Sequence, residues 1–310
     1  MTPLQRYIAE EIATDHVDGL LSRREAMRRL GLLGVSAAAA SALISACSDE
    51  NAYREATSSS SQAPPPPTSD MPADPPPGMA GAVETTAITW AGPAGELQGA
   101  WAAANEPRGG ILVIHENKGL NDWTRSVAGR LAGIGYSALA IDLLSAQGGT
   151  ATFADPAEAT AALGNIAPEA LIADLKFGLT EVQARVPGQK LAAVGFCMGG
   201  GLVWQLLDSG APALAAAVPF YGPAPDNPDF SGSKDVAVLA FYGALDARVN
   251  ATEPAATAAL EAAGMTHTVI IEPGADHAFF NDTGQRYNAV AALDAWTQMG
   301  DWFDQYVAPA

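Results

Sequence analysis

From residue 83 onward, apolar residues fall into two alternating patterns. Short unbroken apolar runs alternate with longer segments in which apolar side chains recur at helical spacing. Unbroken runs are typical of strands that are buried on both faces, as in parallel sheets. The runs predict strands at residues 111–114, 136–141, 191–194, 214–221, 236–242 and 268–271. The spaced segments predict helices at residues 123–134, 168–186, 199–207, 253–263 and 287–306.

A hairpin is predicted ahead of the first buried strand. Residues 87–90 and 97–102 form its two strands, and a Gly-Pro-Ala-Gly turn joins them. Strands that alternate with helices predict a single α/β domain with a mainly parallel central sheet flanked by helices. In the last helix, the spacing places Val290, Leu293 and Phe303 on or near one side. Ligands of such sheets bind at the carboxyl ends of the strands, so residues that follow strands are the candidates for chemistry.

The first 46 residues have a different composition and predict an export signal. A basic cluster at residues 22–29 precedes sixteen uncharged residues, 31–46. That apolar stretch is short for a membrane span, which takes about 20 residues. A basic segment, a short apolar stretch and small residues at its end are typical of a signal peptide. The Arg23-Arg24 pair resembles a twin-arginine signal, although the apolar pair usual after the arginines is here Ala26-Met27.

The uncharged stretch ends at Leu43-Ile44-Ser45-Ala46-Cys47, which resembles a bacterial lipobox. We therefore expect Cys47 to carry a lipid, and the chain to be periplasmic or in the cell envelope, touching membrane only through that lipid. An ordinary cleaved signal and an uncleaved weak anchor remain alternatives. Residues 47–82 are rich in Ser and Pro, bury little apolar surface and predict a disordered tether to a folded domain at 83–310.

Charge and cysteine content exclude several classes of function. The chain carries 16 Lys+Arg against 34 Asp+Glu, a formal net charge of −18. Residues 1–46 hold five basic and five acidic residues, so the whole net charge lies in the remainder. Such a chain lacks the clustered cations that nucleic-acid binding needs. Two cysteines cannot build a disulfide-rich scaffold or a four-cysteine zinc site.

The strongest candidate for chemistry is the segment Gly195-Phe196-Cys197-Met198-Gly199, which follows a predicted strand and opens a predicted helix. A nucleophile elbow needs glycines because its central residue lies on a sharp, strained turn. A thiol at a helix N-terminus is favoured as thiolate, and the next backbone N–H, that of Met198, points to a developing oxyanion. The alternative is a tight turn that contains a structural cysteine.

An acid and a histidine follow the next strands. Asp246 comes after the strand at 236–242, and His277 comes after the strand at 268–271. The order nucleophile, acid, histidine is that of α/β-hydrolases. His115, at the end of a strand, is a rival base. Asp276 is a weaker candidate acid, because a residue adjacent to His277 cannot easily orient its ring.

These residues resemble the dienelactone hydrolase family over about residues 83–309. The elbow at Cys197 is the most specific part of the likeness, and Asp246 and His277 match the family's acid and base. The segment at 115–121 matches the family's glutamate-bearing loop. The resemblance implies that Glu116 contacts the resting thiol and helps to deprotonate it. It also implies that the N–H of Asn117 is the second oxyanion donor.

Two arginines with which family members bind the carboxylate of dienelactone are missing. Ala146 and Asn281 stand at their positions, and without that charge-assisted clamp an anionic substrate should bind poorly. Arg248 and Arg286 are candidates for a different anion site. Four aromatic residues could instead form an apolar pocket, although buried packing is their commoner use: Trp123, Tyr221, Phe279 and Phe280.

The sequence thus predicts an exported, monomeric, cysteine-dependent α/β-hydrolase of neutral or apolar esters or lactones. Cys197 attacks the carbonyl, His277 transfers the proton and Asp246 orients the imidazole. No metal or cofactor is implied. The alternative from another class is an exported lipoprotein that binds a ligand on a hydrolase scaffold without turnover.

Overall fold

The computed structural model of the chain describes residues 1–58 and 75–309. These residues form two compact units. The larger comprises Pro76–Ala154 and Ile166–Ala310, and the smaller comprises Met1–Pro75 together with Asp155–Asn165. The larger unit is therefore interrupted once, between its fourth strand and the helix that begins at Pro168.

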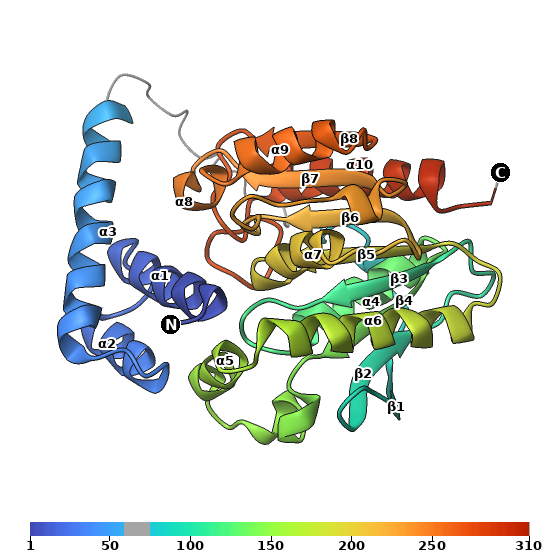
Figure 1. Ribbon diagram of the computed structural model, residues 1–310, viewed down its shortest axis with the longest axis horizontal. Helices are drawn as coiled ribbons and strands as arrows, with labels where there is room; N and C mark the ends of the chain where they lie inside the picture. Colours follow the sequence, from blue (N-terminus) through green and yellow to red (C-terminus); the bar gives the residue numbers. More distant parts are fainter. Residues whose placement is uncertain (59–74, 310) are drawn as a thin grey trace. The chain divides into compact units, whose positions relative to one another are not determined.

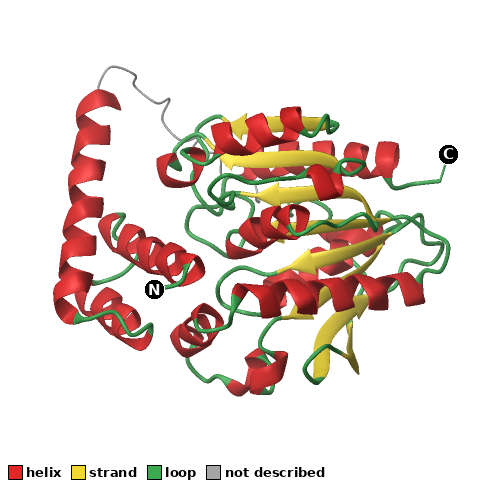
Figure 2. Cartoon of the chain, in the orientation of Figure 1, coloured by secondary structure: helices red, strands yellow, loops and turns green. Residues whose placement is uncertain are grey.

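An eight-stranded sheet forms the centre of the larger unit (Figures 1 and 2). Its strands are β1 Thr86–Ala91, β2 Glu96–Ala102, β3 Gly110–Ile114, β4 Ser137–Asp142, β5 Leu191–Phe196, β6 Leu214–Phe220, β7 Ala237–Gly243 and β8 His267–Glu272. The spatial order is β1-β2-β4-β3-β5-β6-β7-β8. The β1–β2 and β2–β4 ladders are antiparallel and all others are parallel. The predicted mainly parallel α/β sheet is thereby confirmed.

Helices cover both faces of this sheet. They are α4 Asp122–Gly133, α6 Pro168–Arg185, α7 Met198–Asp208, α8 Ala247–Asn250, α9 Glu253–Ala262 and α10 Ala289–Tyr306, with short 3-10 turns η1 Met79–Gly81, η2 Ser145–Gln147, η3 Thr150–Thr152 and η4 Ser231–Ser233. In Figure 1, α6 and α7 lie in front of the sheet and α4 and α10 lie behind it. This layering explains why the central strands carry apolar residues on both faces.

Burial follows the apolar runs closely, except in α10. Every residue of β3, β4, β5 and β7 is buried, whereas the edge strand β8 is only partly covered. In α10, Val290 and Leu293 are 80% and 58% exposed. The buried residues are Ala291, Ala292, Ala295, Met299 and Phe303. The predicted face is therefore wrong in the first half of this helix, because its alanines, rather than its larger apolar residues, face the core.

Glycines allow α7 to begin against the ends of two strands. A Cβ on Gly199 would lie 2.3 Å from the carbonyl oxygen of Ile114, at the end of β3. A Cβ on Gly200 would lie 2.4 Å from that of Phe220, at the end of β6. A Cβ on Gly195 would lie 2.1 Å from the carbonyl oxygen of Gly199. Real Cβ atoms do not approach backbone so closely, so this turn requires glycine at each of the three positions.

The smaller unit consists of α1 Pro3–Val17, α2 Arg23–Leu32, α3 Ala37–Ser58 and α5 Pro156–Gly164. A capping box between Thr2 and Gln5 starts α1. Asp155 caps α5, and its carboxylate lies 2.8 Å from Nη1 of Arg28 in α2. Among the described residues, no helix is long and apolar enough to span a bilayer.

The predicted boundaries of the tether change in two places. The chain is helical through residues 47–58, where α3 continues to Ser58, because helix-forming Ala, Glu and Arg residues follow Cys47. Residues 59–74, which hold most of the Ser/Pro-rich tract, lie outside the described residues. The larger unit begins at Pro76 instead of residue 83. Gly78 packs against the ring of Trp296, and the N–H of Val83 donates to the carbonyl of Gly129.

We predict that Gly199→Ala destabilises the protein by about 2–3 kcal/mol, because its methyl group would collide with the backbone of β3. The free energy of unfolding, measured by urea denaturation, checks this. Gly201→Ala in the same helix is the matched control, since its Cβ would meet only Pro223 at 3.3 Å. A Gly199→Ala protein as stable as the control would contradict the close approach of α7 to β3.

A second prediction concerns Glu272 at the end of β8, which is 3% exposed. Burial, and then the carboxylate of Asp294, raise its pKa from 4.5 to about 7. The folded state therefore holds this proton more tightly than the unfolded state, and stability is lost as the pH rises from 4.5 through 7. Glu272→Gln should raise the melting temperature at pH 8 and change it little at pH 4. The exposed Asp301→Asn on α10 is the control, and equal shifts at both pH values would contradict the prediction.

Candidate active site

Cys197 lies between β5 and α7, at the carboxyl edge of the sheet. Its backbone has φ 55° and ψ −117°, and it serves as the N-cap residue of α7. Its N–H donates to the carbonyl of Phe220 at 3.1 Å, which ties the turn to the end of β6. The residue is 4% exposed. A ring nitrogen of His277 lies within 4.8 Å of the Cys197 Sγ atom.

His277 and Asp246 are joined by a short hydrogen bond. Nδ1 of the imidazole donates to Oδ2 of Asp246 at 2.6 Å, with both side chains buried. This bond directs the second ring nitrogen, Nε2, away from the acid. The structure thus brings together the three residues that the sequence placed after β5, β7 and β8.

The surroundings of Asp246 favour its ionised form. Burial alone would raise its pKa, but the charge and hydrogen bond of His277 outweigh that effect and hold the pKa below its usual value. Arg248 and the N–H of Val249 act in the same direction. The neighbouring Asp276 instead accepts a hydrogen bond from the backbone N–H of His277 at 2.7 Å. Asp276 therefore shapes the turn, and Asp246 orients the ring.

Glu116 follows β3 and is held at both carboxylate oxygens. Nδ2 of Asn281 donates to Oε2 at 2.8 Å, and the hydroxyl of Tyr221 donates to Oε1 at 3.4 Å. Oδ1 of Asn281 accepts bonds from the backbone N–H and the hydroxyl of Thr283, which fixes the orientation of the amide. Glu116 is 6% exposed. Both of these contacts come from neutral groups.

Tyr221 is a site residue whose hydrogen bond the sequence did not predict. Burial is the main cause that raises its pKa well above the usual value, and electrostatic interaction with Glu116 and Cys197 adds to it. Its ring stands edge-on to that of His277, with centroids 5.2 Å apart. Its position at the end of β6 was the available signal.

Backbone strain is concentrated at this edge. Four described non-glycine residues have positive φ, and three of them belong to the site or adjoin it: Cys197, Tyr221 and Ala278. Such conformations cost about 1–3 kcal/mol each and persist only where the surroundings enforce them. Cys197 and Tyr221 are themselves site residues, and Ala278 directly follows His277, so the strain marks this edge as functional.

His115, the rival base, is committed to the backbone. The N–H of Leu143 donates to its Nε2 at 3.2 Å, so its Nδ1 must carry the proton that is donated to the carbonyl of Glu116 at 2.6 Å. Complete burial lowers its pKa, although the Asp142 carboxylate offsets part of that effect. His115 is therefore a neutral ring that links the ends of β3 and β4.

The two predicted oxyanion donors lie at neighbouring backbone positions. Met198 is the first residue of α7, and Asn117 directly follows Glu116 after β3. The start of α7 lies against the end of β3, because the Cβ position of Gly199 is 2.7 Å from the carbonyl oxygen of His115. The segments that carry both N–H groups are thus adjacent.

The structure shows the surroundings of the residues that the sequence offered as candidates for substrate binding. Ala146 is exposed in η2. Nε of Arg286 lies 3.8 Å from a carboxylate oxygen of Asp276. The four aromatic residues pack together in a core beneath the site, with Phe196 stacked on Phe280 at 5.5 Å, and all are at most 4% exposed: Trp123, Tyr221, Phe279 and Phe280. The packing interpretation, rather than the open pocket, describes them.

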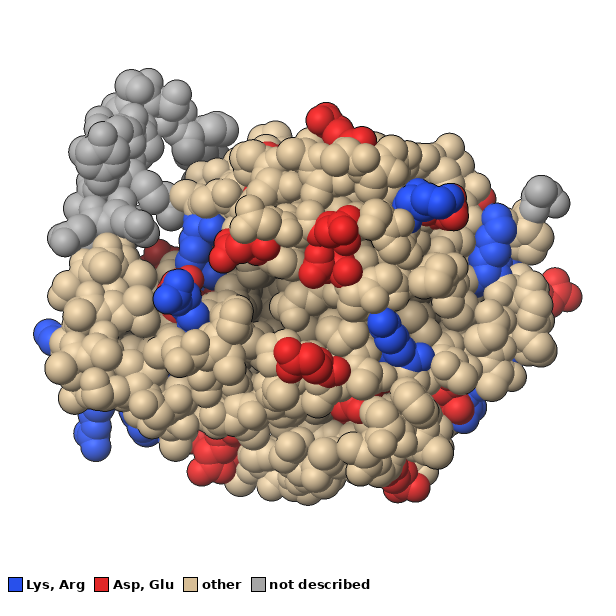
Figure 3. Space-filling model, in the orientation of Figure 1, with Lys and Arg blue, Asp and Glu red and all other residues tan. Residues whose placement is uncertain are grey.

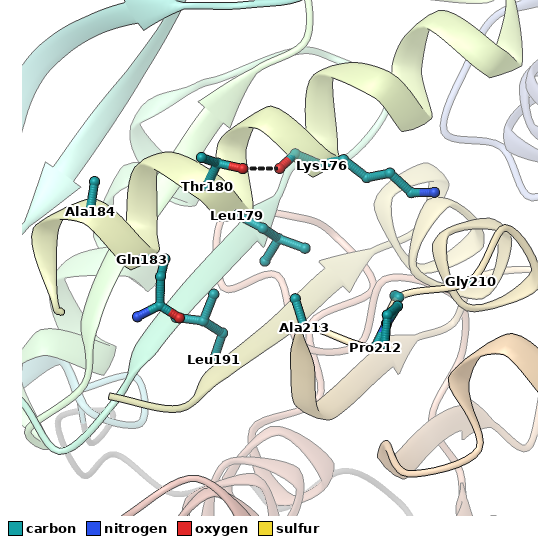
Figure 4. A pocket seen from close by; sticks show the side chains of 10 residues that line it. Lys176, Leu179, Thr180, Gln183, Ala184, Leu191, Gly210, Pro212 and Ala213 are labelled. Carbon is teal, nitrogen blue, oxygen red and sulfur yellow. Dashed lines mark hydrogen bonds between the residues drawn. The ribbon is translucent and has the colours of Figure 1, made fainter. Parts of the chain in front are cut away.

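A separate cavity of about 510 Å³ lies between α6 and the loop that precedes β6 (Figure 4). Leu179 of α6, Leu191 at the start of β5, and Pro212 contribute to its lining. It is at the amino ends of the strands, and the ligands of parallel sheets bind at the opposite edge. On the face drawn in Figure 3, the Lys and Arg side chains of the described residues are scattered among acidic and uncharged residues and form no extended basic patch.

Comparison with known proteins places the chain in a family. The model of the dienelactone hydrolase family matches residues 97–307. A Methylorubrum extorquens protein named "Putative carboxymethylenebutenolidase" is 32% identical over 209 residues, which cover 63% of this chain and 72% of that protein.

Two crystal structures resemble the chain over nearly their whole lengths. One is a "Putative Dienelactone Hydrolase" from Klebsiella pneumoniae, with 29% identity and a TM-score of 0.62, covering 72% of this chain and 99% of that one. The other is a dienelactone hydrolase-like promiscuous phosphotriesterase from metagenomic libraries, with 27% identity and a TM-score of 0.55, covering 73% and 100%. Family match, fold and site geometry agree: the chain belongs to the dienelactone hydrolase family and is a hydrolase of ester or lactone bonds.

Proposed function

We propose that this chain hydrolyses neutral or apolar carboxylic esters or lactones through an acyl-enzyme formed on Cys197. The observation that carries the proposal is the chain of contacts from Cys197 to a His277 ring nitrogen within 4.8 Å, and from His277 to Asp246 at 2.6 Å. The Cys197 thiol gives its proton to Nε2 of His277, the thiolate attacks the carbonyl carbon, and the imidazolium passes this proton to the leaving alkoxide. Water, deprotonated by the same imidazole, then hydrolyses the thioester.

Glu116 and two backbone N–H groups complete the proposed mechanism. Glu116 helps to deprotonate the thiol when substrate binds, a role supported by the Tyr221 hydroxyl, which donates to Oε1 of Glu116 while the Tyr221 ring stands beside His277. The N–H groups of Met198 and Asn117 stabilise the tetrahedral oxyanion. Asp246 remains ionised and keeps the imidazole oriented through both steps.

Uncharged residues at the two positions where family members carry arginines support a neutral substrate. Asn281 binds Glu116 as an uncharged donor, and Ala146 is exposed and uncharged. A substrate carboxylate at this edge would therefore meet the negative charges of Glu116 and Asp246 without a guanidinium clamp. The net charge of −18 opposes the approach of anions as well.

We expect Cys197→Ala to lower kcat for ester hydrolysis by about three orders of magnitude or more, because it removes the nucleophile. The assay compares the full chain with this variant on two esters of equal acyl length, one neutral and one carrying a terminal carboxylate. The unsubstituted chain should prefer the neutral ester by about tenfold or more in kcat/KM, the loss of one charge-assisted contact. Mass spectrometry should find the trapped acyl group on Cys197.

Cys47→Ala is the matched control, since Cys47 is the chain's other cysteine, and it should leave turnover unchanged. Full turnover by Cys197→Ala would refute the cysteine mechanism. Tight binding of the neutral ester with no acylation and no turnover would favour the non-catalytic binding protein instead. A preference for the anionic ester would overturn only the proposed substrate class.

We further propose that the chain is exported by a twin-arginine signal and anchored by a lipid on Cys47. The support is the basic cluster, the sixteen uncharged residues and the small residues before Cys47. Arg23 and Arg24 form the exposed first turn of α2, where Ser22 is the N-cap. Such a pair is accessible to a receptor.

Replacement of both Arg23 and Arg24 by Lys should leave the full-length chain inside the cell, because twin-arginine recognition distinguishes guanidinium from ammonium groups. The same replacement at Arg28 and Arg29, later in α2, is the control and should permit export. Cys47→Ser should abolish incorporation of labelled fatty acid. The measurements are cell fractionation, the mass of the chain and the incorporation of labelled fatty acid. If the unsubstituted chain is exported without a lipid, the segment is an ordinary signal peptide and the lipid anchor is wrong.

A further inference from the structure

The loop after β8 holds two parts of the active site in place at once. His277, five residues after the end of β8, is hydrogen-bonded to Asp246, and Asn281, four residues later, is hydrogen-bonded to Glu116. Between them, Ala278 has φ 60°. A strained residue between two site residues requires that the loop be fixed from elsewhere, because the loop would otherwise relax.

A buried ion pair supplies that fixed point. Nη2 of Arg130, in α4, lies 2.7 Å from Oδ2 of Asp282, and the two side chains are 1% and 6% exposed. The same nitrogen of Arg130 donates to Oγ of Ser126, one turn earlier in α4. Asp282 directly follows Asn281, so the pair connects α4 to the residue beside the Glu116 ligand.

The pair is poorly suited to a purely stabilising role. Nε and Nη1 of Arg130 and Oδ1 of Asp282 have no hydrogen-bond partner among the described protein atoms. Removing two charges from water costs free energy that a pair recovers only when its remaining donors and acceptors are also satisfied. Apolar side chains of similar volume would stabilise this position as well or better. The pair therefore contributes mainly by fixing the position of the loop at Asp282 relative to α4.

We propose that Arg130 and Asp282 are positioning residues that set the loop at residues 277–283, so that Asn281 holds Glu116 and His277 stays aligned on Asp246. Neither touches the reacting groups. The path runs from α4 through the ion pair to Asn281, whose amide is turned toward Glu116 by its bonds to Thr283. The inference rests on the proposed function, because it assigns the pair a role in the same site.

The test uses Arg130→Lys and Asp282→Asn in the full chain. Lys keeps the positive charge and Asn keeps the shape, so both variants preserve much of the buried site. Each should lower kcat about 10- to 100-fold, as expected of a small displacement of catalytic groups. KM should change by less than about threefold, because the pair does not contact substrate. Amide hydrogen exchange of residues 278–284 should become faster.

Two comparisons separate positioning from general destabilisation. Val182→Ala removes a methyl pair from a fully buried site in α6, and it should lower the melting temperature without lowering kcat. The second comparison combines Asp282→Asn with Asn281→Ala. If the pair acts through Asn281, the double variant should lose little more kcat than Asn281→Ala alone, whereas independent effects would multiply.

Unchanged kcat and unchanged exchange in both variants would overturn the proposal. It would also fail if the effects of Asp282→Asn and Asn281→Ala multiply, or if Val182→Ala loses as much kcat at an equal melting temperature. Cys197→Ala is measured in the same assay. If turnover does not depend on Cys197, the proposed function is wrong, and the exchange rates of residues 278–284 still decide whether Arg130 and Asp282 fix the loop.

Discussion

The close approach of α7 to β3 and β6 is the constraint on which the rest of the site depends. Gly199 and Gly200 let the first turn of the helix touch the carbonyl groups that end these strands. The chain can then reverse at Cys197 only with a positive φ, held by the N–H that it donates to Phe220. A larger residue at either glycine would push the helix N-terminus away from the sheet. The thiol would then lose its position beside His277 and near the positive end of the helix dipole.

The central sheet was predictable because strands that are buried on both faces appear in the sequence as continuous apolar runs. Residues 111–114 predicted β3 Gly110–Ile114, and residues 191–194 predicted most of β5 Leu191–Phe196. The helix at 156–164 was missed, although Asp155 before Pro156 is a recognisable start signal. Alanine explains the wrong prediction of the buried face of α10. It is a strong helix former but a weak mark of burial, so the spacing of larger residues misplaced the inner face of α10.

In the active site, too, the features that depend on local sequence were predictable, and those that depend on contacts between distant residues were not. Cys197, Asp246 and His277 were predictable because each follows a strand, and the topology of a parallel sheet brings such residues to one edge. The hydrogen-bond partners of Glu116 were not predictable from the sequence. Asn281 lies 165 positions from Glu116 and Tyr221 lies 105 positions from it, and neither bond has a signature in the sequence. His115 could not be separated from His277 by position alone; the N–H of Leu143 at its Nε2 is what distinguishes them.

Charge is also the basis of the proposed preference for a neutral substrate. Glu116 is held by an amide and a phenol, and neither cancels its charge as a guanidinium would. Of the nearby arginines, Arg286 faces the carboxylate of Asp276, and Arg248 acts on Asp246, whose pKa it helps to lower. On the proposed function, a substrate carboxylate would lose its hydration beside two arginines that already interact with other carboxylates, and this costs free energy for a buried charge. In the proposed mechanism a neutral acyl group brings no such charge into the site, and the backbone N–H groups beside Cys197 stabilise the negative charge that develops on its carbonyl oxygen.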